Sequence, residues 1–448
     1  VSAVRHSVVL DLKKCRGCTT CIKNCPTEAI RVRNGKATIL PNRCIDCGTC
    51  IRVCPHSAVK SVCDSLEQLK KFKYAVAIPD PALYGQFQNL NDVNIVLNGL
   101  LALGFDQVFE AAAASEMLAG IARSRIQRGG QRPVPEISPA CPAVVRLISL
   151  RFPKLISHIA PAISPTELAA ILAREDAVKA TGLPPEDIGI FSIVPCSSLV
   201  TSVHSPVGLP RPVLDGALAI RDVYLALLEP MKKLAREPLQ PLSTSGIMGI
   251  GWAYVGGESA SHLWERYVAV DGINNVIQVL EDIEDGRLPD VDFVELRACT
   301  QGCVGGCLNV ENPFGTKMRL KKLMRELPMS HTRTIPDGQA DEILDSTRAP
   351  EFLPSLQLDS DRMRAMEKMI RIQELEQQLP GLRCGSCGAP SCHAFAEDVI
   401  MGRASLDDCI FKVRERMQHM AGTGNADEYL PAPFRHRPSD PSGGTKSR

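Results

Sequence analysis

Two copies of one cysteine spacing near the amino terminus constrain the fold more than any other feature of this sequence. Each copy reads C-x2-C-x2-C-x3-C and is followed by proline. In this spacing, three thiolates of a short loop reach three irons of one iron–sulfur cube, and the fourth thiolate reaches a second cube. The cysteines are Cys15, Cys18, Cys21 and Cys25 in the first copy, and Cys44, Cys47, Cys50 and Cys54 in the second.

The repeat predicts a ferredoxin-type α+β domain over residues 1–62 that holds two [4Fe–4S] clusters and transfers single electrons. Structural zinc is the alternative, but zinc sites use paired C-x2-C knuckles rather than runs this dense. Residues 29–32 and 37–39, around Asn34-Gly35, predict a short β-hairpin between the runs. One cluster is expected on Cys15, Cys18, Cys21 and Cys54, and the other on Cys25, Cys44, Cys47 and Cys50.

Length and composition indicate a modular protein that is soluble. The chain has 448 residues, and domains average about 150 residues, so about three units are expected. Its 18 cysteines lie in tight runs rather than in a small exported domain, which favours metal ligation over disulfides. Lys plus Arg (51) nearly equals Asp plus Glu (50), so the net charge favours neither nucleic acid nor a membrane surface.

No membrane span or secretory signal is expected. The most apolar stretch, residues 95–105, is much shorter than the ~20 residues that cross a bilayer. Residues 1–14 lack the unbroken apolar core of a signal peptide. We therefore expect a cytoplasmic protein of an anaerobic cell.

The central part of the chain alternates short apolar runs with helical stretches, which is typical of an α/β fold with parallel sheets. We expect this body to be two-lobed and to span residues 70–355. The expected strands are Tyr74–Ile78, Gln107–Glu110, Val134–Ile137, Ile188–Val194 and Phe293–Leu296.

Three of these strands are followed by a cysteine, namely Cys141, Cys196 and Cys299. Functional groups in open α/β sheets gather beyond the carboxyl ends of the strands. With Cys303 added, we expect these thiols to converge on one buried site, although each alone would be interpreted as an ordinary buried cysteine. Cys299, Cys303 and Cys307 are expected on one face of a helical turn, and the glycines between them allow close approach of backbone to a cluster.

At these cysteines the sequence of residues 1–354 resembles the large subunit of [FeFe] hydrogenases. The supporting stretches are residues 245–250, 256–258 and 309–314. The resemblance implies that Cys141, Cys196, Cys299 and Cys303 bind a [4Fe–4S] cube. It also implies that Cys303 is the catalytic residue that bridges this cube to a diiron unit carrying CO and cyanide.

The sequence departs from this family pattern at four positions. Ala140 stands where a hydrogenase has a proton-relaying cysteine, and Leu199 replaces a lysine that donates a hydrogen bond to a cyanide. Ser202 replaces a glutamate and Arg297 replaces a methionine. Leucine has no donor, and loss of such supporting groups commonly weakens metal binding or activity by ~10–100-fold.

Residues 356–415 predict a linker helix and a small, mainly helical Fe–S domain. Met363, Met366 and Ile370 recur at helical spacing within residues 359–379, which predicts an amphipathic helix packed on the body. The following cysteines resemble those of the small Fe–S domain of Rnf-complex electron carriers and corrinoid iron–sulfur proteins. They are Cys384, Cys387, Cys392 and Cys409.

These carboxyl-terminal cysteines predict another [4Fe–4S] site, with zinc as the alternative because two thiolate pairs also close a tetrahedron. His393, beside Cys392, is expected to be solvated rather than ligating. Residues 416–448 are rich in Gly, Pro, Ser and charge, which predicts a disordered tail.

Two functions follow from the resemblance. The first is an iron–sulfur redox protein of the [FeFe] hydrogenase family that senses H2 or turns it over slowly, if at all, with electrons relayed through [4Fe–4S] clusters. The alternative is a non-catalytic electron-transfer or cluster-handling protein that keeps the cubane but lacks the diiron unit. The expected partners are a ferredoxin-type donor or acceptor or a signalling protein, with H2 and protons added if the diiron unit is bound.

Overall fold

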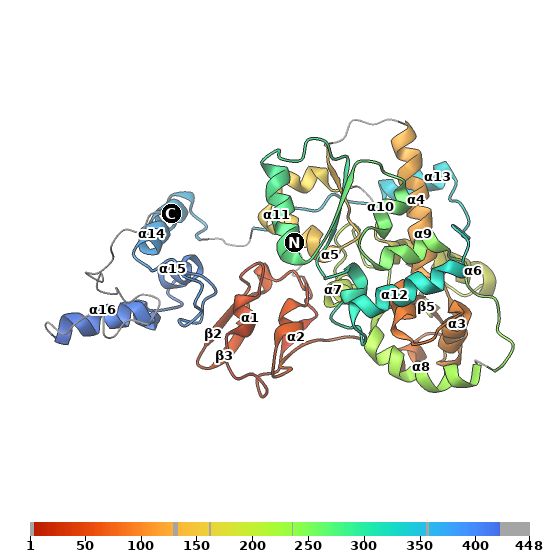
Figure 1. Cartoon of the computed structure of the whole chain (residues 1–448), viewed down its shortest axis with the longest axis horizontal. Coiled ribbons are helices and arrows are strands. Elements are labelled where there is room, and N and C mark those ends of the chain that lie inside the picture. Colours follow the sequence, from red (N-terminus) through yellow and green to blue (C-terminus); the bar gives the residue numbers. More distant parts are fainter. Residues whose placement is uncertain (1–3, 129–132, 161–162, 235, 355–357, 422–448) are drawn as a thin grey trace, which may run out of the picture.

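The computed structural model describes residues 4–128, 133–160, 163–234, 236–354 and 358–421. Figure 1 shows three parts, with the amino-terminal domain between the large body and a helical carboxyl-terminal module. Among these described residues no helix combines the length and apolar character needed to cross a bilayer.

The amino-terminal domain contains two antiparallel strand pairs and two short helices. Strands β2 (Ile30–Arg33) and β3 (Lys36–Ile39) form the predicted hairpin. Asn34 and Gly35 connect them with φ angles of 50° and 70°, as a two-residue hairpin turn of mirror-image type requires. The other elements are β1 (Val8–Leu10), which pairs with β4 (Val59–Ser61), and helices α1 (Thr20–Lys23) and α2 (Thr49–Val53).

The larger sheet of the body is parallel throughout and has the strand order β6-β5-β8-β9. Side chains of successive residues on β5 enter two different cores, Ala75 and Ala77 on one face and Val76 and Ile78 on the other. Both faces are therefore covered, as parallel sheets require. The strands are β5 (Tyr74–Pro79), β6 (Gln107–Val108), β8 (Ile188–Val194) and β9 (Gly216–Ala219).

Helices on the two faces of this sheet belong to different hydrophobic cores. Helices α4 (Ala111–Arg128) and α6 (Pro165–Thr181) pack in one, and α3 (Val93–Ala102) and α8 (Ile220–Leu234) in the other. The remaining helices of the body are α5 (Pro142–Arg151), α7 (Ser197–His204), α9 (Ile247–Ile250), α10 (Gly257–His262), α11 (Ile273–Glu284), α12 (Pro313–Leu323) and α13 (Asp337–Asp345).

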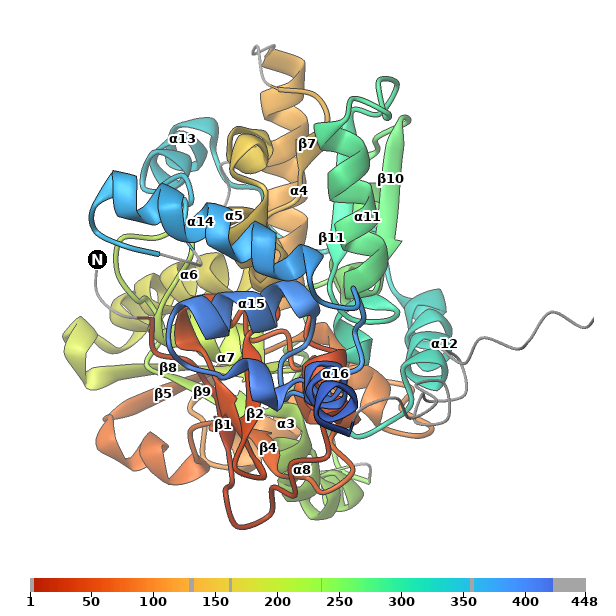
Figure 2. The same cartoon turned by 90° about the vertical axis from the view of Figure 1, so that its left-hand side faces the viewer.

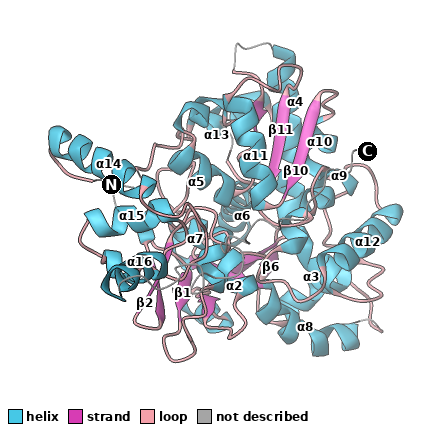
Figure 3. Cartoon of the chain, turned by 60° about the vertical axis from the view of Figure 1, so that its left-hand side comes forward, coloured by secondary structure: helices cyan, strands magenta, loops and turns pink. Residues whose placement is uncertain are grey.

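A second parallel sheet has the order β10-β11-β7. Its strands β10 (Tyr267–Asp271) and β11 (Phe293–Arg297) lie side by side in Figure 3, and the short β7 (Glu136–Ile137) pairs with β11. Apolar residues of α5 and α11 pack on this sheet in a third core. The predicted parallel α/β arrangement of the body is therefore confirmed.

All five strands predicted for the body are present, but two are shorter than expected. The run at residues 107–110 pairs only at 107–108, and the run at 134–137 only at 136–137. Two strands were not predicted. One of them, β9, reads Gly-Ala-Leu-Ala, and these residues do not favour strands by themselves.

The carboxyl-terminal module consists of α14 (Arg362–Gln377), α15 (Cys392–Ile400) and α16 (Ile410–Ala421). The prediction that α14 packs on the body through Met363, Met366 and Ile370 is wrong, because these side chains are 74%, 52% and 54% exposed. The helix packs instead on α15, since its buried residues Ile372 and Leu375 join the small core of the module.

The prediction of a disordered tail is wrong for its first residues, 416–421. Helix α16 continues to Ala421, so residues 416–421 are helical. The rest of the predicted disordered tail, residues 422–448, lies outside the described residues.

Candidate metal centres

Two cavities in the amino-terminal domain each gather four cysteines. In each cavity, three cysteines come from one run and one from the other, which is the crossed arrangement predicted from the spacing. The first cavity is lined by Cys15, Cys18, Cys21 and Cys54. The second is lined by Cys25, Cys44, Cys47 and Cys50. Four convergent thiols in a short loop framework fit a [4Fe–4S] cube.

Backbone amides point at sulfur atoms in both cavities. Ala29 donates a hydrogen bond of 3.2 Å to Sγ of Cys25, and Ala58 donates one of 3.3 Å to Sγ of Cys54. Each donor lies four residues after its acceptor, so the two halves of the domain repeat the contact. Hydrogen bonds to ligand sulfur help to set the potential of an iron–sulfur cluster.

Burial opposes ionisation of the thiols in these cavities. It raises the pKa of Cys21 to about 11 and the pKa of Cys47 to about 12. Without a cation these thiols stay protonated near neutral pH. Because ligation requires thiolate, binding of iron releases the protons and contributes directly to folding of the domain.

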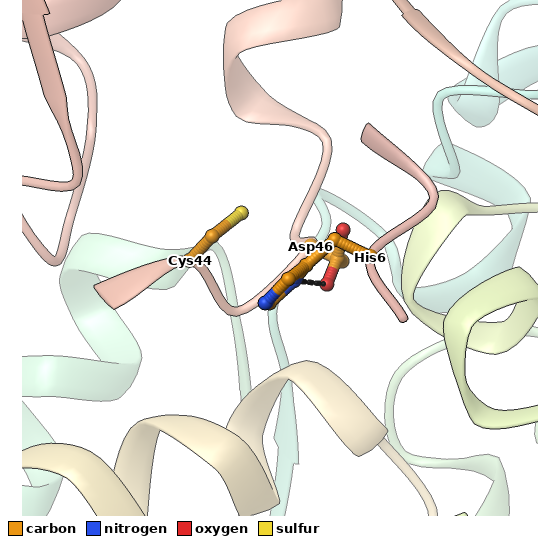
Figure 4. A group of neighbouring side chains, drawn as sticks. All are labelled: His6, Cys44 and Asp46. Carbon is orange, nitrogen blue, oxygen red and sulfur yellow. Dashed lines mark hydrogen bonds and ion pairs between the residues drawn. The ribbon is translucent and has the colours of Figure 1, made fainter. Parts of the chain in front are cut away.

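A histidine and a carboxylate lie beside one of the cluster cysteines. Nδ1 of His6 lies 2.6 Å from a carboxylate oxygen of Asp46, and one ligand atom each of His6, Cys44 and Asp46 falls within 4.8 Å of the others (Figure 4). Asp46 also accepts a hydrogen bond of 3.2 Å from the backbone of Val8. The His6–Asp46 pair therefore joins the amino-terminal segment to the loop that carries Cys44.

In the body, the predicted site cysteines lie at the carboxyl ends of strands. Cys141 follows β7 and begins α5, Cys196 follows β8 and begins α7, and Cys299 follows β11. Cys303 lies in a short 3-10 turn at Gly302–Gly305. The expectation that Cys299 and Cys307 share one helical turn with Cys303 is wrong, since both lie outside this turn.

Glycine and reversed backbone angles explain this course of the chain. Gln301 and Gly302 have φ angles of 65° and 84°, which break a regular helix. A Cβ atom on Gly306 would lie 2.2 Å from the carbonyl oxygen of Pro195. Only glycine allows this loop to approach the loop of Cys196 so closely.

The four body cysteines lie near enough for their charges to interact. Burial raises the pKa of Cys196 well above its usual value, and the charges of Cys299, Cys307 and Cys303 raise it further. Burial also raises the pKa of Cys303, as do the charges of Cys141 and Cys299. These converging buried thiols fit a cube, and its assignment to Cys141, Cys196, Cys299 and Cys303 stays a prediction.

The amino-terminal domain contacts this buried site directly. Nη1 of Arg52, on α2, donates hydrogen bonds of 3.2 Å to Sγ of Cys299 and 3.0 Å to the carbonyl oxygen of Gly305. A Cβ atom on Gly48 would lie 2.5 Å from Sγ of Cys307. The loop that carries Cys47 and the buried thiols are therefore separated by little more than one layer of side chains.

A buried network of charges lies beside Cys303. Arg297 donates hydrogen bonds of 3.1 Å to Glu295 and 2.9 Å to Glu258. Ser138 donates to the same Glu258 carboxylate at 2.7 Å. The positive charge of Arg297 lowers the pKa of Cys303 against the effect of burial. Arg297 and the stretch that contains Glu258 were singled out separately from the sequence, but the ion pair between them was not predicted.

A third carboxylate near Cys303, Asp80, was not predicted. It begins the 3-10 turn Pro81–Gln86 and accepts a hydrogen bond of 2.8 Å from the backbone of Ala82. Burial raises the pKa of Asp80 to about 6, although Arg297 opposes the shift. Asp80 directly follows the carboxyl end of β5. Functional side chains of open α/β sheets gather at such positions, so its place in the chain could have marked it as a candidate.

The four departures from the family pattern differ in their surroundings. Ala140 lines a largely apolar cavity together with Trp252 and Glu258. Leu199 is buried in the core around β8. Ser202 lies in a different cavity and accepts a hydrogen bond of 3.4 Å from Arg146. Of the four, Leu199 has no hydrogen-bond donor to offer, and the guanidinium donors of Arg297 bond to Glu258 and Glu295.

The carboxyl-terminal cysteines also lie together. The charges of Cys384 and Cys409 raise the pKa of Cys387, after burial as the main cause. His393 does not face them, because Nδ1 lies 2.7 Å from Glu376 and Nε2 lies 3.4 Å from Glu397.

Three family models match the chain. Residues 7–55 match a 4Fe-4S dicluster domain, and residues 379–411 match a model for an Fe-S cluster. Residues 73–199 and 229–307 match the C-terminal domain of the iron-only hydrogenase large subunit. The protein therefore binds iron–sulfur clusters.

The chain is also similar to individual proteins. The chain is 26% identical over 361 residues to the periplasmic [Fe] hydrogenase large subunit of Nitratidesulfovibrio vulgaris, which covers 67% of this chain and 86% of that protein. A stretch of 36 residues is 53% identical to the corrinoid/iron-sulfur protein large subunit of Moorella thermoacetica and covers 8% of each protein. A solved [FeFe]-hydrogenase structure from Chlamydomonas reinhardtii has 18% identity and a TM-score of 0.44 over 64% of this chain and 94% of that chain.

Proposed function

Because the chain belongs to an [FeFe] hydrogenase-like family, we propose that it is a non-catalytic electron-transfer protein on that fold that keeps the cube and lacks the diiron unit. It carries four [4Fe–4S] clusters: two in the amino-terminal domain, one on Cys141, Cys196, Cys299 and Cys303, and one in the carboxyl-terminal module. Its partner is a ferredoxin-type electron donor or acceptor, or a signalling protein.

The single observation that carries this proposal is the hydrogen bond from Arg52 to Cys299. It joins the helix beside one ferredoxin cavity to a ligand of the buried site. Cys47, in that cavity, is close enough for the charge of Cys299 to raise its pKa. Electrons therefore have a short path between the ferredoxin domain and the buried cube.

The lack of H2 turnover follows from three side chains of the body. Ala140 has no proton to exchange, and Leu199 has no hydrogen-bond donor. Arg297 is 3% exposed and places a fixed positive charge near Cys303. In the family a diiron unit supplies the chemistry of H2 when it is bound. The charge network of Arg297, Glu258 and Glu295 is not suited to hold such a unit.

The second candidate is a hydrogen sensor, and the cavity at Ala140 favours it. This cavity has a volume of about 30 Å³ and is lined mainly by apolar side chains such as Leu118 and Trp252. A single water needs ~10–15 Å³, so the cavity admits a molecule as small as H2. Sensing needs only a ligand-dependent change between states, so slow turnover is compatible with it.

An anaerobic redox titration followed by electron paramagnetic resonance tests the electron-transfer proposal. We expect iron and sulfide for four cubes, and we expect Cys303→Ser to remove only the signal of the buried cube. Cys63→Ser is the matched control, because Cys63 lies outside all four groups and its Sγ faces Ser61. If Cys303→Ser left every cluster signal unchanged, the buried site would not hold a cube.

A further inference from the structure

The carboxyl-terminal module is bound to the ferredoxin domain by buried ion pairs. Nε of Arg31 lies 2.6 Å from Asp398, and Nη2 of Arg43 lies 2.8 Å from Glu397. The side chains of all four residues are less than 9% exposed. Arg33 adds a further ion pair of 3.1 Å to Asp398. Two adjacent acids on α15 are thus held by three arginines of the ferredoxin domain.

The backbones of the two parts also meet. The backbone amide of Val32 on β2 donates a hydrogen bond of 2.8 Å to the carbonyl oxygen of Gly388. A Cβ atom on Gly388 would lie 1.9 Å from the carbonyl oxygen of Val32, so glycine is required for this approach. Arg33 donates to the carbonyl oxygen of Cys387. The loop that carries two module cysteines therefore lies directly against the ferredoxin hairpin.

This loop also touches the helix that separates the ligands of the two ferredoxin cavities. A Cβ atom on Gly385, between Cys384 and Cys387, would lie 3.3 Å from Cδ1 of Ile22 and 3.3 Å from Cε of Lys23. Both belong to α1, which carries Cys21 and ends two residues before Cys25. The two domains lie side by side in Figures 1 and 2.

We propose that the carboxyl-terminal module is a built-in redox partner of the ferredoxin domain. Its cluster exchanges single electrons with the ferredoxin clusters across this arginine–acid interface. In each transfer one reduced cube loses an electron and one oxidised cube gains it, and no bond changes. The inference rests on the proposed function, because it assumes a cluster in the module.

The chemistry of the interface supports a specific, permanent contact. Burying charges is unfavourable unless every charge is paired, and here each acid faces at least one arginine. Opposite charges on two surfaces fix orientation and exclude other partners. These contacts hold the module against the ferredoxin hairpin.

The test compares the intact chain with a double variant, Glu397→Gln with Asp398→Asn. We expect this variant to lose the magnetic coupling between the reduced module cluster and the ferredoxin clusters, and to lose fast reduction of the module cluster in rapid-freeze experiments. Glu367→Gln with Glu374→Gln is the matched control, since it makes the same charge change on the exposed face of α14. The control is expected to keep both properties.

Arg43→Gln provides a second variant that leaves the module sequence intact. It is expected to weaken the same coupling, so a folding fault within the module cannot explain a shared loss. Unchanged coupling and reduction rates in both variants would overturn the proposal. Cys384→Ser separates the two claims: if it removes no cluster signal, the module holds no cluster and the proposed function fails instead.

Discussion

Arg52 of the ferredoxin domain donates a hydrogen bond of 3.2 Å to Sγ of Cys299, a residue some 250 positions later in the chain. The same guanidinium nitrogen holds the carbonyl oxygen of Gly305 at 3.0 Å. A fixed positive charge therefore lies between the ferredoxin cavity and the buried thiols. This contact joins the ferredoxin domain to the body at one of the proposed cube ligands.

Arg52→Gln is expected to shift the reduction potential of the buried cube to a more negative value. Both a positive charge and a hydrogen bond to sulfur favour the reduced, more negative cluster, and the variant removes the charge. Arg52→Lys keeps the charge and should give a smaller shift. An anaerobic potentiometric titration measures this, and an unchanged potential in Arg52→Gln would contradict the assigned role.

Cys54→Ser tests the crossed ligation of the ferredoxin domain. Cys54 belongs to the second run in sequence but lines the cavity of the first run. We expect this variant to alter the cluster of Cys15, Cys18 and Cys21 and to leave the other ferredoxin cluster intact. Electron paramagnetic resonance distinguishes the clusters, and loss of the cluster of Cys44, Cys47 and Cys50 alone would show that ligation is not crossed.

Arg297→Met is expected to reduce the free energy of unfolding by about 3–5 kcal/mol, because it leaves buried carboxylates unpaired. Adding Glu258→Gln and Glu295→Gln should restore part of the loss, since no unpaired charge remains. Anaerobic denaturant unfolding measures both effects. The control is Arg287→Met, which removes exposed ion pairs to Asp282 and Asp285 and should change little. Equal effects of Arg297→Met and the control would contradict the importance of the network.

Asp80 predicts a pH dependence of stability. Burial raises its pKa to about 6 in the folded protein, above its usual value of ~3.9. A raised carboxyl pKa stabilises the folded state fully below the usual pKa, and this stabilisation is lost as the pH rises through about 6. Between pH 5 and pH 7, the unfolding temperature of the native chain should therefore fall more than that of Asp80→Asn. Equal decreases in unfolding temperature for the two proteins would show that Asp80 is not the group responsible.

Most of what could be predicted from the sequence about the candidate metal sites came from the positions of the cysteines. Spacing determines which thiols of a short loop reach one cube, so the crossed grouping of Cys25 and Cys54 follows from local chain geometry. Strand ends meet at one edge of a parallel sheet, so the convergence of Cys141, Cys196 and Cys299 also follows. Both features depend on short-range rules that a single sequence contains.

Contacts between distant parts of the chain were not predictable in the same way. Arg297 pairs with Glu258, and Arg31 pairs with Asp398, yet nothing in the spacing of these residues links them. The failure at α14 has a related cause. Met363, Met366 and Ile370 indicate an apolar face on α14. The helix nevertheless packs through Ile372 and Leu375, which belong to the core of the module, and the spacing of the apolar residues did not reveal this.

The most direct test of the central claim is an anaerobic infrared spectrum, in the region of metal-bound CO and cyanide, of the chain produced together with the hydrogenase maturation proteins. The sample must first be shown to hold all its [4Fe–4S] clusters. An electron-transfer protein predicts no such bands and no reduction of the clusters by H2. Bands that shift when H2 is added would contradict this account and would establish a diiron site with a catalytic or sensing role.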